Sequence, residues 1–525
     1  MLDTSKGAKV ENAPEPGEGP HRYETQWTEG RDENHSVVIV GAGLAGSIAA
    51  YRLAEAGIAC TVLERGRRWP ITVSGDTFPH FPSCDKRLVW RDGVVGDGLL
   101  PRAPWLPRMA RSTLWSRSTG LLDVAWHRNL TTVCGAGVGG GTLVYGGMLP
   151  QPGAEQFGAV FPDIPYEEMS AKYYPTARRR LRAQPFPDDL LPSRRYRSNR
   201  IWKTLIERSG MQAERVESSF DFNVIRAELK GEAPPSATVG QYLFTGCNSG
   251  AKMSVDRTYL AQAEATGRAT VRPLHNVTHI AHHAGKFRLT IEQLHPDGTV
   301  LNVRVISCDR LIMAAGGVHT PRLLVTARDT GALPDLNEHV GAGWGTNGDQ
   351  APLIKTLVTR TGAPQGGPPA FLARGEGGSI MLSHGGYPLP FESGLMQCTG
   401  LGVPDAYGQW TYEADTRNAQ LHWPSHGDRS VQRQVSALMR RITRQTRYGA
   451  VFVDPFKRRP LVLHPLGGTV IGKATDPYGR IHGYQGLYCL DSALMPGSTA
   501  AVNPSLTIAA VAERCLDHII TDFTE

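Results

Sequence analysis

The sequence predicts an α/β protein with more than one domain, and three observations carry this prediction. Near the N-terminus, an apolar run at residues 37–40 leads into a glycine-rich turn, a helical pattern and a second apolar run at residues 58–63. Further along, apolar and polar residues alternate at 287–291 and 303–305, on either side of a Pro-Asp-Gly turn. A chain of 525 residues is also too long for one small core. The first pattern predicts a parallel sheet and the second an antiparallel hairpin.

The first unit carries the signature of a Rossmann-like, dinucleotide-binding domain. Gly41 permits the tight turn after the strand, Gly43 lets the backbone approach a pyrophosphate, and Gly46 lets the helix pack closely on the strand. The start of the helix offers free N–H groups to the phosphates. Glu64 ends the second apolar run, 23 residues after Gly41, where an acidic residue is expected to hold the ribose hydroxyls.

The elements that follow are less regular at first. Residues 67–128 are rich in Trp, Pro and Arg, which indicates an insertion into the nucleotide-binding domain. Helical patterns come next at residues 166–181 and 201–209, and a short strand is predicted at residues 271–277.

The C-terminal half returns to regular patterns. Residues 310–317 predict a buried strand that ends in glycines, and a helix begins at residues 319–325. Half-polar strand and helix signals in residues 350–450 suit a second domain. The chain closes with a strand at residues 487–490 and a long helix at residues 505–520.

Composition is typical of a soluble globular protein, with 40% hydrophobic and 20% charged residues. The net charge of +7 comes partly from arginine-rich segments at residues 178–180 and 440–444. Because no aromatic residues are interleaved, these segments indicate solvated helix faces, and no nucleic-acid partner is expected. No apolar stretch approaches the ~20 residues that span a bilayer, so no integral membrane association is expected.

The first 34 residues are polar and rich in Pro, Gly and Glu, which predicts a disordered arm. The eight cysteines are scattered without a Cys-x-x-Cys pair, so neither a disulfide framework nor a metal site is expected. A cytoplasmic location fits this usage, and secretion stays open for a chain whose leader has been removed. We expect a monomer or a simple homo-oligomer.

Three further blocks of sequence resemble the glucose–methanol–choline (GMC) flavoprotein oxidoreductases. They are the glycine-rich run at residues 135–148, the string at residues 328–348, and the C-terminal pair His464-Pro-Leu-Gly-Gly and Asn503-Pro504. Within the family, the chain resembles the bacterial cholesterol oxidases with non-covalently bound FAD. The resemblance extends over nearly all of residues 37–517.

The resemblance implies the GMC fold, in which a Rossmann-like FAD-binding domain is assembled from discontinuous segments. We assign residues 35–70, 130–150, 252–345 and 458–525 to this domain. The remaining segments would form an α+β substrate-binding domain with a mixed or antiparallel sheet, and they are residues 71–129, 151–251 and 346–457.

By resemblance, the glycine-rich run lies along the flavin, since glycines have no Cβ to block close approach. Apolar residues within the run favour this buried path over a flexible surface loop. The resemblance also implies that Val277 meets the adenine through its backbone and that Asp491 lies near the ribityl or pyrophosphate part. The residues predicted to bind FAD are Gly41, Gly43, Leu44, Ala45, Gly46, Glu64, Gly135, Gly139, Gly140, Gly141, Thr142, Tyr145, Gly146, Gly147, Met148, Val277, Gly316, Asp491, Asn503, Pro504 and Ser505.

Three residues are candidates for catalysis, and each also has an ordinary structural interpretation. His464 resembles the family's active-site histidine, which binds or deprotonates the substrate hydroxyl; the alternative is a satisfied core histidine. Asn503 precedes Pro504, so it caps a helix, contacts the substrate oxygen, or does both.

Glu392 falls on the carboxylate that moves a proton during double-bond isomerisation in cholesterol oxidases. Lying after Pro and Phe in an apolar pocket, its charged form would be disfavoured. The alternative is a surface glutamate in a Pro-rich loop.

The chain departs from the cholesterol oxidase subgroup at positions that border the predicted flavin. Tyr145 stands in place of a small polar residue, and Leu461, Leu463 and Ser505 stand in place of aromatic residues. These differences leave open whether a sterol is the substrate.

The predicted function is FAD-dependent oxidation of a secondary alcohol on a bulky, mostly apolar substrate, sterol-like or polycyclic, to a ketone. O2 is the expected acceptor and is reduced to H2O2, and isomerisation follows where the ketone is β,γ-unsaturated. Two alternatives keep the fold: a dehydrogenase with a non-oxygen acceptor, and a non-redox isomerase, lyase or cyclase with bound flavin. FAD is expected to be non-covalent, because no histidine or cysteine stands out as a tether.

Overall fold

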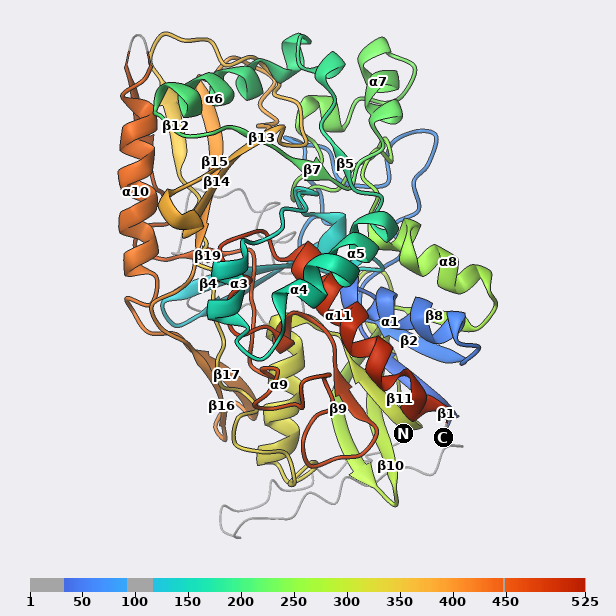
Figure 1. Ribbon diagram of the computed structural model, residues 1–525. Helices are drawn as coiled ribbons and strands as arrows, with labels where there is room; N and C mark the ends of the chain where they lie inside the picture. The colour runs from blue at the N-terminus through green and yellow to red at the C-terminus, as the bar shows by residue number, and fades with distance from the viewer. Residues whose placement is uncertain (1–32, 92–116, 447–448, 525) are drawn as a thin grey trace, which may run out of the picture. The chain divides into compact units, whose positions relative to one another are not determined.

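The computed structural model of the chain describes residues 33–91, 117–446 and 449–524 (Figure 1). Residues 1–32 of the predicted arm, and residues 92–116 of the predicted insertion, lie outside this part. The last two residues of the arm begin strand β1 (Glu33–Val40). The chain from Glu33 onward forms one compact unit, so its predicted division into two domains stays a prediction.

The first of two large sheets is mixed and has the strand order β8-β2-β1-β11-β10-β9, with β20 also paired to β11. β8, β2, β1, β11 and β20 run parallel, whereas β10 and β9 are antiparallel to their neighbours. The predicted hairpin is confirmed as β10 and β11. The bounds of the remaining strands are β2 (Cys60–Glu64), β8 (Ala269–Pro273), β9 (His275–His283), β10 (Lys286–Leu294), β11 (Val300–Met313) and β20 (Leu487–Cys489).

The strand–helix–strand unit predicted near the N-terminus is confirmed as β1, α1 (Leu44–Glu55) and β2. The last four residues of β1, Val37–Val40, are all buried, as expected for a parallel strand covered on both faces, and α1 packs against β1 and β2. α1 packs against α8 (Tyr259–Ala265) and α11 (Ser505–Ile519), which stand beside it in Figure 1. A Cβ on Gly46 would lie 1.9 Å from the carbonyl oxygen of Gly41, so only glycine allows this packing of α1 on the turn.

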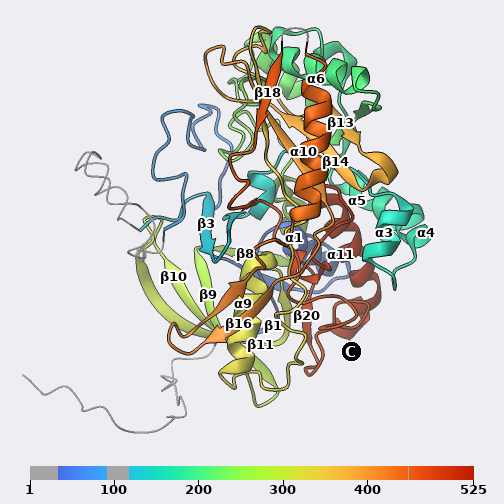
Figure 2. The same ribbon diagram turned by 90° about the vertical axis from the view of Figure 1, so that its left-hand side faces the viewer.

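The second large sheet is antiparallel, with the order β18-β12-β15-β14-β13-β6. Helices α6 (Arg197–Arg208) and α10 (Arg429–Thr443) cover one face, and Figures 1 and 2 show α10 running along the sheet. Residues of the other face, such as Met381 and Leu401, pack against Met148 of the glycine-rich run and Val502. The strands are β6 (Glu214–Arg215), β12 (Leu353–Thr356), β13 (Phe371–Arg374), β14 (Ile380–Gly385), β15 (Leu395–Gly402) and β18 (Ala450–Val453).

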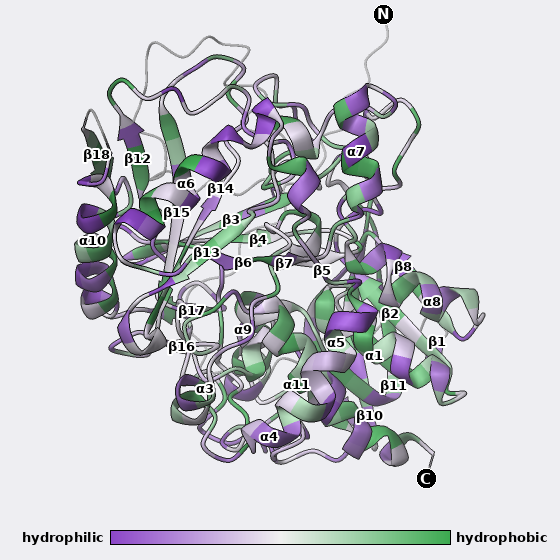
Figure 3. Cartoon of the chain, turned by 45° about the horizontal axis from the view of Figure 1, so that its top comes forward, coloured by the Kyte–Doolittle hydropathy of each residue, from purple (hydrophilic) through white to green (hydrophobic). Residues whose placement is uncertain are grey.

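The sequence of α10 explains which of its faces is buried and which is exposed. Val431, Val435, Met439 and Ile442 recur at helical spacing and are buried against the sheet, while the arginines at 440–441 are exposed. Figure 3 shows these purple and green bands along the helix. The expectation of a solvated helix face is confirmed here.

Small sheets and helices complete the fold. Strand β19 (Leu461–Val462) pairs with β4 (Leu130–Gly135), which also pairs with β3 (Leu122–His127), and this pairing fixes the chain just before His464. The other elements are β5 (Gln184–Pro185), β7 (Glu217–Ser218), β16 (Gln409–Glu413), β17 (Asn418–His422), α3 (Ala154–Val160), α4 (Tyr166–Glu168), α5 (Tyr174–Arg180), α7 (Phe222–Lys230) and α9 (Gly316–Asp329).

Two predicted elements are corrected. The single strand predicted at residues 271–277 is two strands, β8 and β9, because Leu274 has a left-handed φ of 60° and redirects the chain. The helix predicted at residues 166–181 contains a π-helical stretch at Met169–Tyr173 between α4 and α5.

Two kinds of feature, a membrane-spanning helix and a metal site, are absent from the part of the chain that the structure describes. Within it, no helix is both long and apolar enough to cross a bilayer. Within the same residues, no three His, Cys, Asp or Glu side chains are grouped so that they could hold a metal ion.

Candidate active site

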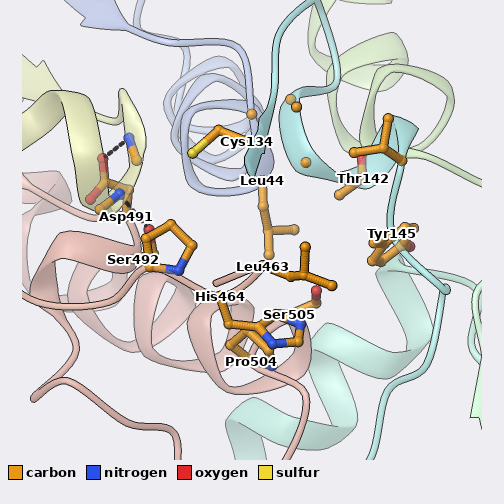
Figure 4. Close-up of a pocket in the computed structure, with 18 of the residues that line it drawn as sticks. Leu44, Cys134, Thr142, Tyr145, Leu463, His464, Asp491, Ser492, Pro504 and Ser505 are labelled. Atoms are coloured by element: carbon orange, nitrogen blue, oxygen red, sulfur yellow. Dashed lines mark hydrogen bonds between the residues drawn. The ribbon is translucent and has the colours of Figure 1, made fainter. Parts of the chain in front are cut away.

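A deep cavity lies where the turn after β1, the glycine-rich run, the starts of α9 and α11 and the second sheet meet. Figure 4 shows side chains from these elements, such as Leu44, Tyr145 and His464, surrounding it. All the residues predicted to bind FAD line the cavity except Gly46 and Gly139. His464 and Asn503 line it as well, and Glu392 does not.

The nucleotide end of the cavity is the start of α1. Gly41 has a φ of 103°, and a Cβ there would lie 2.3 Å from the carbonyl oxygen of Ala314. α1 has no side-chain cap and no acidic residue in its first turn, so its N–H groups and positive dipole end are available to an anion.

Glu64 lies beside this turn and is buried. Its carboxylate accepts hydrogen bonds from the backbone N–H of Ala42, at 2.9 Å, and of Gly66, at 2.8 Å. Burial raises the pKa of Glu64, against the effect of these backbone donors. The carboxylate therefore braces the turn and still faces the cavity, where a ribose hydroxyl can donate to its remaining lone pairs.

The glycine-rich run is docked on the same turn. The N–H of Gly139 donates to the carbonyl of Ala42 at 2.9 Å, and a Cβ on Gly140 would lie 2.6 Å from the Cα of Gly43. Gly46 and Gly139 were predicted to contact FAD but do not line the cavity. Gly46 has the packing role that was also predicted for it, whereas Gly139 has a left-handed φ of 115°, and a Cβ there would lie 2.9 Å from the side chain of Leu143.

Asp491 connects the last strand of the first sheet to α9. Its carboxylate accepts from the N–H of Gly316 at 2.6 Å, from Thr320 Oγ1 at 2.6 Å and from the N–H of Ala493 at 2.7 Å. Asp491 thus caps α9 while lining the cavity (Figure 4). Burial raises its pKa, and the three donors act in the opposite direction.

His464 is held by a residue that sequence analysis missed, Asp349. Asp349 Oδ1 lies 2.6 Å from His464 Nδ1, and its Oδ2 accepts from the backbone N–H of Leu463 at 2.6 Å and of His464 at 2.8 Å. Asp349 is only 4% exposed. Because Nδ1 donates to this carboxylate, Nε2 keeps its lone pair and can accept a proton from a ligand in the cavity.

Asn503 lies directly before α11 without capping it. Pro504 is the N-cap residue of this helix, and no side chain caps its N–H groups. Among the described residues, no group hydrogen-bonds to the buried Oδ1 of Asn503. Buried carboxamides normally have partners, so this orphaned atom, in a residue that lines the cavity, indicates a bound group that supplies one.

The prediction that Glu392 lies in an apolar pocket is wrong. The residue is exposed, and its carboxylate accepts from the N–H of Thr361 at 3.1 Å, of Gly362 at 2.8 Å and of Gly394 at 3.0 Å. Burial alone would raise the pKa of Glu392, but the three backbone donors and the Thr361 hydroxyl together outweigh it and lower the pKa. Glu392 stabilises its own loop, in agreement with the alternative interpretation of a surface glutamate in a Pro-rich loop.

A partly buried cluster of Arg65, Asp123 and His319 forms another wall. Asp123 Oδ2 lies 2.7 Å from Arg65 Nη2 and 2.8 Å from His319 Nε2, and both partners line the cavity. Burial alone would raise the pKa of Asp123, but Arg65 and His319 hold it well below its ordinary value. No motif signalled this cluster, because its members lie far apart in the sequence.

Two further side chains bear on how a flavin would be held. Burial raises the pKa of the Cys134 thiol and of the Tyr145 phenol to about 12 in each case, so both stay neutral near pH 7. A neutral thiol is a poor nucleophile. The donor set, namely two uncapped helix starts, a glycine cradle and an orphaned carboxamide, fits a dinucleotide with a flavin ring at the Asn503 end.

Comparison with known proteins identifies the family of this chain. Residues 36–328 match the GMC oxidoreductases, and residues 409–512 give a second match to the same family. A cholesterol oxidase of Mycobacterium tuberculosis is 27% identical over 92% of this chain and 90% of its own length. A cholesterol oxidase of Acinetobacter baumannii is 21% identical over 93% of this chain and 94% of its own length.

A solved structure shares the fold. The crystal structure of pyridoxine 4-oxidase from Mesorbium loti superposes with a TM-score of 0.60 at 13% identity, covering 92% of this chain and 99% of that one. At this identity the likeness concerns the fold alone. The family matches, which extend over more than half of the sequence, carry the assignment. This chain belongs to the GMC oxidoreductase family and is an FAD-dependent alcohol oxidoreductase.

Proposed function

We propose that the protein oxidises a secondary alcohol on a bulky, sterol-like or polycyclic substrate to a ketone, with non-covalent FAD and with O2 as acceptor. The observation that carries this proposal is the Asp349–His464 pair, whose histidine lines one cavity with Asn503 and the glycine-lined nucleotide site. Apolar lining residues such as Met148, Phe244 and Leu463 suit a large carbon frame. The two cholesterol oxidases support this substrate class.

The protein side chains move and stabilise charge. His464 Nε2 accepts the hydroxyl proton of the substrate, and the Asp349 carboxylate stabilises the imidazolium that results. The carboxamide of Asn503 hydrogen-bonds the substrate oxygen, and the start of α11 places its positive dipole end beside the reacting groups. FAD held by the start of α1 and the glycine-rich run would supply the two-electron acceptor for the hydride of the carbinol carbon, with O2 as the final acceptor and H2O2 as its product.

No isomerisation is assigned to this site. The only base proposed for it was Glu392, and that carboxylate lies outside the cavity with its oxygens bound by backbone N–H groups. The products expected from a Δ5-3β-alcohol are therefore a ketone and H2O2, with the double bond left in place by the enzyme.

The test is spectroscopic. Purified protein should be yellow, and acid precipitation should release the flavin into the supernatant if FAD is non-covalent. Secondary polycyclic alcohols should bleach the bound flavin under anaerobic conditions, and air should restore the colour with one H2O2 per cycle. Bleaching without reoxidation by air would point to another acceptor. Product formation without any bleaching would reject the oxidation.

His464→Ala and His464→Gln form a matched pair for the base. Both should slow anaerobic bleaching by about 10²- to 10⁴-fold, because a positioned general base contributes that much. The visible spectrum of the flavin serves as the control for folding and loading. An unchanged bleaching rate in either variant would remove His464 from its role.

A further inference from the structure

Residues 345–349 lie between the two segments that carry the proposed catalytic side chains, and we call them the bridging turn. On one side, Gly345 pairs with Leu466, just after the catalytic histidine, through backbone hydrogen bonds of 2.7 and 3.0 Å. On the other side, the N–H of Asn347 donates to the carbonyl of Gly497 at 3.2 Å. A Cβ on Gly345 would lie 2.3 Å from that same carbonyl oxygen, so the two backbones are in direct contact.

The side chain of Asn347 is buried and hydrogen-bonds to the segment that leads into Asn503. Its Nδ2 donates to the carbonyl of Val502 at 2.8 Å, and its Oδ1 accepts from the N–H of Thr499 at 3.0 Å and from the hydroxyl of Ser498 at 3.2 Å. Val502 directly precedes Asn503. Asn347 therefore holds the backbone from which Asn503 enters the cavity.

The segment that Asn347 holds has an unfavourable backbone conformation. Ala500 and Ala501 have φ values of 63° and 60°, in the left-handed region that residues with a Cβ seldom occupy. Such residues persist only where the surrounding structure holds them. Both alanines are buried, and the hydrogen bonds of Asn347 bracket them at Thr499 and Val502. The conformation is thus maintained by contacts from outside the segment.

Resting on the function proposed above, we propose that Asn347 is a positioning residue for Asn503. Asn347 and Asp349 belong to the same turn. One short element therefore sets the positions of both proposed catalytic side chains, Asn503 and His464. Asn347 does not line the cavity, so it acts through Val502 and not on the substrate. A hydrogen-bonding group that is misplaced by even about 1 Å loses much of its effect on the rate.

Asn347→Gly removes the side chain without adding backbone strain, because Asn347 has a φ of 54°, which suits glycine. In the holoenzyme, anaerobic bleaching at saturating alcohol should slow by about tenfold to a hundredfold. KM should change less, and the histidine ¹⁵N shifts of His464 should stay as in the wild type, because Asp349 keeps its contact with the ring. An unchanged bleaching rate would overturn the proposal.

Asn129→Gly is the matched control. Asn129 lies in the turn between β3 and β4 and also has a left-handed backbone, with a φ of 76°. Its Nδ2 also donates to a backbone carbonyl, that of Trp423, at 2.9 Å. This variant should bleach at the wild-type rate. Equal losses in the two variants would show a general cost of replacing such an asparagine and would reject the specific role of Asn347.

Asn347→Asp tests the same contact at constant side-chain shape. It keeps an acceptor for the N–H of Thr499 but replaces the donor to the Val502 carbonyl with a second carboxylate oxygen. Bleaching should slow in this variant as well. Flavin content and melting temperature control for folding in both variants. A wild-type rate in Asn347→Asp would reject the positioning role, whether or not Asn347→Gly folds.

Hydrogen exchange separates this proposal from the proposed function, because it needs no turnover. Amide exchange of the holoenzyme, followed by mass spectrometry, is compared for residues 497–504 and for α11. In Asn347→Gly the first segment should exchange at least about tenfold faster than in the wild type, and α11 at an unchanged rate. Absence of bleaching by every alcohol would reject the oxidation and leave the exchange result to decide the positioning role. Unchanged exchange at residues 497–504, or faster exchange over the whole chain, would reject that role.

Discussion

Asp349 decides which nitrogen of His464 faces the cavity. Its Oδ2 already accepts two backbone N–H groups, so an Asp349→Asn side chain must place its oxygen there and its NH2 group against Nδ1. Nδ1 then becomes an acceptor and Nε2 carries the proton. We expect kcat to fall by about 10²- to 10⁴-fold, the contribution of a general base, with little change in KM.

The tautomer itself can be measured. Histidine ¹⁵N shifts should report a protonated Nδ1 in the wild type and a protonated Nε2 in Asp349→Asn. The double variant with His464→Ala should be no slower than His464→Ala alone, because the two residues act as one unit. Additive losses would show that Asp349 acts elsewhere.

Asp428 lies behind the same loop and makes stability depend on pH. Burial raises its pKa from 3.8 to about 7, and the carboxylates of Asp349 and Asp405 add to this, while Thr346 donates to it. Between pH 4 and 7 the folded protein holds a proton that the unfolded chain has lost, so stability falls as the pH rises through this window.

Asp428→Asn should remove this loss of stability with rising pH. At pH 8 the variant should be more stable than the wild type, by at most about 4 kcal/mol for a shift of this size, and the difference should vanish near pH 4. Melting temperatures of the holoprotein across this range check it. The exposed Asp415→Asn should show no such trend. A constant difference at every pH would contradict the titration.

At the scale of elements, two glycines of one turn have separable roles. A Cβ on Gly43 would meet nothing closer than the Cα of Gly140 at 3.8 Å, and its φ of −77° suits alanine. Gly43→Ala should therefore fold as apoprotein but bind FAD at least about tenfold more weakly, since the methyl group stands where the pyrophosphate approaches. Gly46→Ala should destabilise the apoprotein itself, because its Cβ would lie 1.9 Å from the Gly41 oxygen.

Melting of the apoprotein and FAD titration distinguish the two effects. Gly158→Ala is the control, since this exposed helical glycine has no described atom within 4 Å of an added Cβ. Alanine there should be neutral or stabilising by about 0.5 to 1 kcal/mol. Equal losses of FAD affinity and apoprotein stability in Gly43→Ala would refute the separation.

These elements also show what sequence patterns can reach. The β1–α1–β2 unit, the β10–β11 hairpin and α11 were predictable because each is encoded by local periodicity and turn residues. The break at Leu274 was not, because its left-handed backbone is imposed by pairing to two different strands. Loops were least predictable: the resemblance to cholesterol oxidases assigned Glu392 to the cavity, but in the structure its carboxylate binds backbone N–H groups of its own loop region outside the cavity.

The residues of the candidate site also divide into those that sequence patterns predict and those that they do not. The glycines and His464 could be predicted from the sequence, because the glycines occur at a fixed spacing and His464 belongs to a short motif. Asp349 acts on His464 through a contact between residues 115 positions apart in the sequence. Such contacts follow from tertiary packing, so no local pattern could have revealed them.

At the scale of the whole molecule, one buried carboxylate ties four helices together. Glu513 on α11 is fully buried and binds Arg52 of α1 at 2.5 Å, Arg180 of α5 at 2.8 Å and the hydroxyl of Tyr259 on α8 at 2.8 Å. α1 and α11 both begin at the cavity, so this junction sets the separation of the two helix starts that frame it.

Glu513→Gln should destabilise the protein by about 1 to 3 kcal/mol, since it takes a buried charged acceptor from Arg52, Arg180 and Tyr259, while Arg52 keeps Asp517 and Arg180 keeps Glu55 as a partner. Glu55→Gln is the matched control, because Glu55 also pairs with Arg180, at 3.2 Å, but is exposed and should cost less than about 1 kcal/mol. Urea unfolding of the holoproteins measures both. Since Glu513 does not line the cavity, any loss of FAD affinity in its variant reports the changed positions of α1 and α11. Similar unfolding midpoints for the two variants would show that the junction carries no more than a surface ion pair.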